Sequence, residues 1–155
     1  MPTFVDLAKV GPDTGMQRLS STKIVLEPGE KTERLCYEMH EAVYYIISGY
    51  TLFTMSSSGA DFTYSMQQAS AMWLSDSAEH YLYNDGAVPM ECICFKIRVD
   101  QSKQTTGKEV QRRMVDLNTV PVAFVGTAST MRIAFRGSEI GSERIDTVER
   151  NISNP

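Results

Sequence analysis

The chain has no long apolar run and no cluster of basic residues. None of its apolar stretches is long enough to cross a bilayer, and residues 1–6 lack the basic and then apolar layout of a signal peptide. Its formal net charge is −4 at pH 7, without a basic patch that would attract nucleic acid or an anionic membrane surface. We therefore expect a cytoplasmic protein with neither nucleic acid nor a membrane among its partners.

Cysteine is scarce, and its placement does not indicate disulfides. The chain has 3 cysteines, Cys36, Cys92 and Cys94, and the last two alternate with Ile93 and Phe95 along one expected strand. Neighbours on one face of a strand rarely pair with each other, which favours reduced thiols. With 155 residues, 42% of them hydrophobic, and no low-complexity tract or proline-rich linker, the chain is expected to be compact.

What is present is a β pattern. The run 43–47 is β-branched and aromatic and ends at a Ser-Gly turn signal, 48–49. Cys36, Glu38 and Tyr44 have the same parity, so they share one face if the chain stays extended between them.

A second β signal follows in the middle of the chain. The apolar run 71–74 meets a polar break at 75–79 and resumes at 80–84. On the resumed strand His80, Leu82 and Asn84 are expected to share a face.

At these residues the chain resembles the cupin superfamily, the small double-stranded β-helix barrels. The first cupin motif has a His-x-His pair, a Glu four residues after the second His, and a Gly seven residues after the Glu. On this chain these positions hold Cys36, Glu38, Ala42 and Gly49, so only the glycine is kept. Many cupins carry one more His that does not bind the metal, and His40 stands in that place.

The second cupin motif is matched in a similar way. Its Gly, Pro-x-Gly, His and Asn positions hold Ala69, Ser75, Ser77, His80 and Asn84. The His and the Asn are kept, whereas the turn residues are not. The resemblance covers roughly residues 20–98 and consists of spacing with few identities.

The resemblance implies an all-β fold, a double-stranded β-helix or jelly-roll barrel, with extra C-terminal strands. We expect the cupin barrel in residues 1–104 and a C-terminal extension in 105–155. At most one short helix is expected, over 106–114.

The extension repeats the start of the chain in outline. Residues 115–117 echo 5–7, and 132–135 echo 23–26, which indicates either the relic of a second cupin or a chance match between β segments. In either case the C-terminal strands need a sheet edge, on this barrel or on a partner. Uncovered edges invite association, so a homodimer is expected.

Three alternatives compete for the chemistry inside the barrel. In the first, Cys36, Glu38 and His80 bind a metal, and zinc or iron would suit these ligands. That set keeps only one ligand of the family's usual four.

In the second alternative no metal is needed. Glu38 and His80 exchange a proton with the substrate, while Tyr44 donates a hydrogen bond to a developing oxyanion. This arrangement suits isomerisation, dehydration, cyclisation or decarboxylation of a small organic substrate. The third alternative is a cavity that binds an effector without turnover.

The preferred hypothesis is a cofactor-free lyase, isomerase or cyclase with Glu38, His80 and Tyr44 as catalytic residues. The substrate-binding residues are expected to be Cys36, His40, Trp73 and Asn84.

Overall fold

The chain is organised almost entirely by strands. The computed structural model describes residues 1–8, 19–57, 59–98 and 114–119, together with the backbone of 124–125, 129–135 and 147–152. These residues form twelve strands and one turn of 3-10 helix, η2 (Leu117–Thr119), so the predicted all-β class is confirmed. The strands are β1 (Thr3–Ala8), β2 (Leu19–Leu26), β3 (His40–Ser48), β4 (Tyr50–Ser57), β5 (Ala60–Gln67), β6 (Ser70–Leu74), β7 (His80–Tyr83), β8 (Met90–Arg98), β9 (Met114–Asp116), β10 (Phe124–Val125), β11 (Ser129–Phe135) and β12 (Thr147–Ile152).

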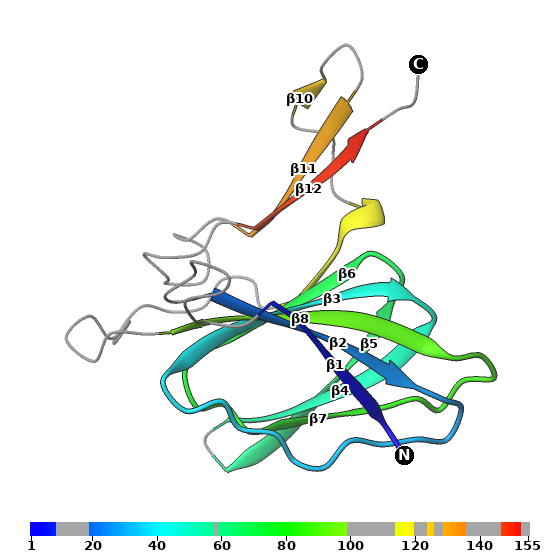
Figure 1. Ribbon diagram of the computed structural model, residues 1–155, viewed down its shortest axis with the longest axis vertical. Coiled ribbons are helices and arrows are strands. Elements are labelled where there is room, and N and C mark those ends of the chain that lie inside the picture. Colours follow the sequence, from blue (N-terminus) through cyan, green and yellow to red (C-terminus); the bar gives the residue numbers. More distant parts are fainter. Residues whose placement is uncertain are drawn as a thin grey trace.

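Two sheets face each other and form the barrel (Figure 1). The larger sheet has the order β1-β2-β8-β3-β6-β9, and the smaller has the order β5-β4-β7. Isolated bridges from Lys31 to Tyr83 and from Leu35 to His80 attach the segment between β2 and β3 to the open side of β7. The predicted double-stranded β-helix is therefore the architecture observed for the described residues among 1–98.

The core lies between the two sheets because alternate residues of each strand point inward. From the larger sheet come Ile24, Tyr44 and Cys92, and from the smaller come Phe53 and Leu82, all fully buried. Burying a large apolar side chain is worth roughly 1.5–3 kcal/mol. The interior is therefore a packed apolar core, and Cys92 and Cys94 are reduced within it, as predicted.

A second apolar cluster covers the outer face of the larger sheet. Trp73 packs there with Val43 and with Val115 of β9. Trp73 is only 2% exposed, but it alternates with the inward-pointing Met72 and Leu74. It therefore points away from the barrel interior, and its predicted place in a cavity wall is wrong.

The stretch that carries the first cupin motif is not extended, contrary to expectation. Tyr37 accepts a backbone hydrogen bond from His40, and Met39 has a positive φ of 61°, so a turn precedes β3. An extra turn changes which residues face inward. Tyr37 packs against the core, whereas Cys36 and Glu38 are exposed, so the expected common face with Tyr44 is wrong.

The turns of the second motif keep the backbone that glycine normally adopts. Ala69 and Ser77, which replace the family's glycines, have φ values of 67° and 61°. A left-handed conformation costs a residue with a Cβ roughly 1–2 kcal/mol. The alignment of the motif with these turns is supported by the backbone, even though the glycines themselves are absent.

The C-terminal strands begin on the barrel and then leave it. β9 pairs with β6 at the end of the larger sheet, whereas β10, β11 and β12 form a separate antiparallel sheet that stands beyond the barrel in Figure 1. Residues 106–113 of the predicted helix and the 104/105 boundary lie outside the described residues, and Met114 belongs to β9. In the described part of the chain no helix is both long and apolar enough to cross a membrane.

The first prediction concerns Gly49, the glycine kept from the first motif. Its φ is +78°, and an added Cβ would lie 2.8 Å from the Met90 Cα and closer still to the Pro89 carbonyl oxygen. Gly49→Ala should lower the free energy of unfolding by about 3 kcal/mol or more, through backbone strain and the clash.

Gly59→Ala is the matched control in a urea titration. Gly59 has a similar φ of +79°, but nothing lies within 4 Å of an added Cβ. Its cost should be about 1 kcal/mol, from strain alone. Equal costs for the two variants would contradict the proposed role of the Pro89 contact.

Candidate functional site

His80, the histidine kept from the second motif, is held at both ring nitrogens. Its Nδ1 lies 2.9 Å from the Ala78 carbonyl oxygen, which can only accept, so Nδ1 carries the proton. Nε2 then accepts a hydrogen bond from the Tyr44 hydroxyl at 2.7 Å. Since the Tyr44 proton is used there, Tyr37 donates to the Tyr44 oxygen at 3.1 Å.

Aromatic rings enclose this histidine. Phe53 stacks on it with 5.5 Å between centroids and 2° between planes. Tyr44 and Tyr37 meet it edge-on at 5.3 and 5.4 Å. With a relative exposure of 0%, His80 is one member of a packed aromatic cluster and does not line an open cavity.

Burial keeps this cluster uncharged. Desolvation lowers the pKa of His80 to about 4, although its hydrogen bond to Ala78 acts in the opposite direction. Burial also raises the pKa of Tyr44 well above its usual value, and neighbouring Cys94 and Tyr37 add to that effect. At neutral pH the relay from Tyr37 through Tyr44 to His80 is therefore a chain of neutral groups.

The other residues predicted for the interior lie outside it. The Cys36 thiol is exposed and donates to the Ser77 carbonyl oxygen at 3.4 Å. Glu38 is exposed, and its carbonyl oxygen contacts Nδ1 of His40 at 2.8 Å in the turn before β3. Glu38 does not face His80 in the interior, so the expected acid/base pair is not formed.

Asn84 is buried, and its side chain makes hydrogen bonds to backbone groups. Its Nδ2 donates to the carbonyl oxygens of Leu26 and Val88 at 2.9 and 2.8 Å. Its Oδ1 accepts from the Gly86 amide at 3.0 Å. The amide fixes the loop between β7 and β8, and the geometry gives no support to the predicted contact with substrate.

The donor set proposed for a metal does not fit one. His80 Nε2 is occupied by Tyr44, while Cys36 and Glu38 lie outside the core. Partial desolvation raises the pKa of Cys36, and the Glu38, Glu79 and Asp76 carboxylates raise it further, so the thiolate ligand is disfavoured. Among the described residues no three His, Cys, Asp or Glu side chains are grouped closely enough to hold a metal ion.

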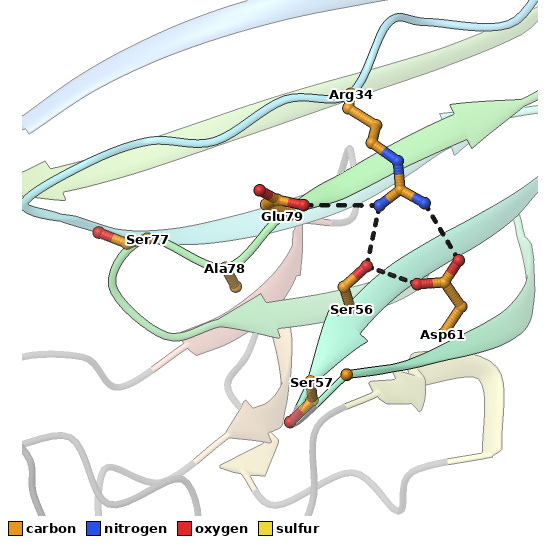
Figure 2. A pocket seen from close by; sticks show the side chains of 8 residues that line it. Arg34, Ser56, Ser57, Asp61, Ser77, Ala78 and Glu79 are labelled. Carbon is orange, nitrogen blue, oxygen red and sulfur yellow. Dashed lines mark hydrogen bonds and ion pairs between the residues drawn. The ribbon is translucent and has the colours of Figure 1, made fainter.

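An open polar pocket lies at the mouth of the barrel, and its lining includes the residues that directly precede His80 in the chain (Figure 2). It has a volume of about 430 Å³. Its lining comes from the segment before β3, the β4–β5 hairpin and the β6–β7 turn: Arg34, Ser56, Ser57, Gly59, Asp61, Ser77, Ala78 and Glu79. The residues Ser77 to Glu79 run directly into His80, so the pocket and the buried histidine share one turn.

Arg34 is the centre of this pocket. Its Nη1 donates to the Ser56 hydroxyl at 2.9 Å, and its Nη2 donates to an Asp61 carboxylate oxygen at 3.1 Å. Glu79 lies 3.6 Å from Nη1 on the opposite side, and Ser56 also donates to Asp61 at 2.5 Å. The guanidinium is therefore fixed in position although its side chain is 51% exposed.

The contacts of Arg34 affect the charge of the neighbouring carboxylates. The hydrogen bond from Ser56, together with Arg34, lowers the pKa of Asp61. Two carboxylates surround one guanidinium, which leaves an excess of hydrogen-bond acceptors at the mouth. Such a site can bind a hydrophilic molecule, but it offers no buried group for proton transfer.

Sequence reasoning did not identify Tyr37, Arg34 or Asp61. Tyr37 is adjacent to Cys36, but the expected parity placed it on the opposite face. Arg34 and Asp61 are 27 positions apart and belong to no motif. Only the fold brings them together, so no local signal was available.

Comparison with solved structures identifies the fold. The 7S globulin of Momordica charantia matches with a TM-score of 0.70 and 11% identity, over 90% of this chain and 52% of that one. The cupin domain of Schizosaccharomyces pombe Cnp3 matches with a TM-score of 0.53 and 12% identity, over 63% of this chain and 64% of that one. The chain has the cupin fold.

A Pseudomonas aeruginosa protein described as glyoxylate-induced is also similar to this chain. Its TM-score is 0.68 at 13% identity, over 89% of this chain and 51% of that chain. The chain thus spans about half the length of the globulin and of the Pseudomonas protein. No family model and no curated protein sequence matches it.

The second prediction is that the buried His80 makes the folded protein sensitive to acid. The unfolded chain binds a proton at His80 near pH 6.5, whereas the folded chain does so only near pH 4. Stability is therefore complete above the unfolded pKa and falls as the pH is lowered towards 4, by up to about 3 kcal/mol.

The chain has 2 histidines, so NMR can follow each one. His80→Gln should remove this part of the pH dependence in denaturation curves, whereas His40→Gln should retain it. A midpoint for His80 near its unfolded value would show that the aromatic cluster does not exclude the proton.

Proposed function

We propose that this cupin binds a small hydrophilic molecule at the mouth of its barrel and does not turn it over at the buried histidine. The observation that carries the proposal is the contrast between two neighbouring places. The interior at His80 is filled by Phe53, Tyr44 and Tyr37, while the open cavity just outside it is polar and centred on Arg34.

The lining of the pocket indicates the chemistry of the ligand. Three serine hydroxyls, two carboxylates and one guanidinium line it, and Ala78 is its single apolar side chain among the lining residues. A volume of about 430 Å³ lies in the range of small-molecule sites. Excess acceptors favour a ligand with several hydroxyl or amino donors, such as a monosaccharide, a polyol or an amino sugar.

Preorganisation supports binding at this place. Because Ser56, Asp61 and Glu79 already hold Arg34, the ligand would not have to order a flexible side chain. Holding a group in its bound geometry removes part of the entropic cost of association. The remaining hydrogen-bonding capacity of Ser57 and Ser77 would then set the orientation of the ligand.

A metal-free lyase, isomerase or cyclase is the second candidate. The observation that favours it is the short contact between Tyr44 and His80, two groups that can transfer a proton. Its difficulty is access, since both residues are 0% exposed. Turnover would require the rings packed around His80 to move, among them Tyr37, which is half-buried beneath the Lys96 ammonium at 4.6 Å.

The third prediction tests the pocket with saturation-transfer NMR against a panel of monosaccharides, polyols and amino sugars. Arg34→Gln should reduce the affinity of any binding member by about tenfold or more, because a charged hydrogen-bond donor is lost. Arg98→Gln is the control, with the same change of charge at an exposed position at the end of β8.

Tyr44→Phe separates the two candidates. It should leave binding at the mouth unchanged, because Tyr44 does not line the pocket. Binding that is lost equally in Arg34→Gln and Arg98→Gln would refute the pocket. Turnover of a panel member that disappears in Tyr44→Phe would favour the enzyme instead.

The fourth prediction concerns metal content. Untagged protein analysed by plasma mass spectrometry should contain far less than one equivalent of zinc or iron, because the donor atoms of Cys36, Glu38 and His80 do not converge. Near one equivalent in the wild type that is absent from both Cys36→Ala and His80→Ala would overturn the metal-free proposal.

A further inference from the structure

The pocket around Arg34 lies at one end of the outer face of the smaller sheet. Ser56 alternates along β4 with the buried Met55, so its side chain is on this outer face. Its amide donates to the carbonyl oxygen of Glu79 at 2.8 Å, and on its other side it pairs with Asp61. Glu79, Ser56 and Asp61 of the pocket therefore form one row across the sheet, in line with β7, β4 and β5 (Figure 2).

Further rows of side chains continue this outer face away from the pocket. Directly opposed residues of antiparallel strands lie on the same face, so the strand pairing defines each row. Two residues of a strand span about 7 Å, so the rows extend the face by about 20 Å beyond the pocket. In order from the pocket, the rows consist of Tyr81, Thr54 and Thr63; of Tyr83, Leu52 and Ser65; and of Tyr50 and Gln67.

Most of the side chains in these rows carry a hydroxyl, and none carries a formal charge. The Thr54 and Thr63 hydroxyls hydrogen-bond to each other at 2.9 Å, and the Tyr50 and Ser65 hydroxyls do so at 2.6 Å. A hydroxyl can both donate and accept, so each pair keeps capacity for a ligand hydroxyl. Thr63 and Ser65 are exposed, which leaves this capacity accessible. Such a surface suits a ligand with hydroxyls at intervals along its length.

Two tyrosines add rigid contact area to the same face. The Lys31 ammonium lies 4.1 Å from the centre of the Tyr81 ring, and the guanidinium of Arg34 lies 5.6 Å from it. These cation–π contacts hold the ring in place. Tyr81 and Tyr83 are half-buried, and their hydroxyls have no hydrogen-bond partner among the described residues. Because Arg34 also lines the pocket, it connects the pocket directly with the tyrosines.

We propose that the ligand is an oligosaccharide, with its terminal sugar in the Arg34 pocket and the following sugars along the outer face of β4, β5 and β7. This inference rests on the proposed function, because it takes the pocket as the site of the first sugar. A sugar ring combines apolar C–H groups with hydroxyls. Tyrosine rings and Leu52 beside threonine and serine hydroxyls offer the complementary mixture of apolar area and hydrogen-bonding groups.

The charge of this face argues against a nucleic-acid strand as its occupant. Proteins that bind single strands combine aromatic side chains with a positively charged groove that follows the phosphates. The strands β4, β5 and β7 contain no lysine or arginine, and Arg34 is already paired with Asp61 and Glu79. The whole chain has a formal net charge of −4. A neutral chain rich in hydroxyls fits this face better than a polyanion.

The fifth prediction is that affinity rises with the length of the sugar chain. The test is an amide NMR titration of the full chain with cello-, malto- and chito-oligosaccharides, from monosaccharides to hexasaccharides. In the series that binds, the tetrasaccharide should bind at least about tenfold more tightly than the monosaccharide, because it also contacts the rows beyond the pocket. Tyr83→Ala should remove this gain without weakening the monosaccharide, since Tyr83 does not line the pocket.

Phe95→Ala is the matched control for the loss of an aromatic ring. Phe95 is 38% exposed but belongs to β8 of the larger sheet, so its removal should keep the gain with length. Circular dichroism checks that both variants are folded. The wild type supplies a readout that needs no variant, since the amide signals of Leu52, Ser65 and Tyr83 should shift with the hexasaccharide and not with the monosaccharide.

The outcomes separate this inference from the proposed function. Equal affinity for all lengths, with monosaccharide binding that still depends on Arg34, would overturn the extended site and leave the pocket in place. An equal loss of the gain in Tyr83→Ala and Phe95→Ala would also overturn the extended site. If no sugar of any length binds, both the extended site and the sugar pocket are wrong.

Discussion

The hydrogen bond from the Tyr44 hydroxyl to Nε2 of His80 determines what the interior of this barrel can do. It occupies the nitrogen that would otherwise be directed at a ligand, and it places both rings where Phe53 and Tyr37 can pack around them. If Nε2 of His80 were buried without a hydrogen-bond partner, the folded state would lose roughly 1–3 kcal/mol. The buried histidine therefore depends on the Tyr44 hydroxyl. Once this hydrogen bond forms, the centre of the barrel is closed, and the polar pocket lined by Arg34 lies outside it.

The fold could be predicted from the sequence because spacing constrains the backbone more than identity does. Gly49 and His80 stood at motif distances, and the strands around them followed with small errors at their ends. Ala69 and Ser77 show how strong this constraint is, since both adopt the left-handed conformation of the glycines that they replace. A motif can therefore have its characteristic residues replaced and still adopt the same turns.

The site could not be predicted in the same way, because side-chain direction depends on single residues. The turn before β3 reversed the expected faces, so Tyr37 entered the core and Glu38 remained outside. Trp73 was misplaced for a related reason, because both faces of β6 are buried and parity alone did not distinguish them. Arg34 and Asp61 met only through tertiary pairing, which no local pattern encodes.

The turn from Ser77 to His80 joins two different electrostatic environments. On its outer side Arg34, Asp61 and Glu79 are charged and reach solvent, so dissolved salt screens their attraction. On its inner side the histidine and its phenol partner are neutral and dry, and mobile ions have nothing to screen there. Higher ionic strength should therefore weaken the ion pairs of Arg34 with Asp61 and Glu79 at the mouth of the barrel, while the hydrogen bond between Tyr44 and His80 in the core stays unchanged.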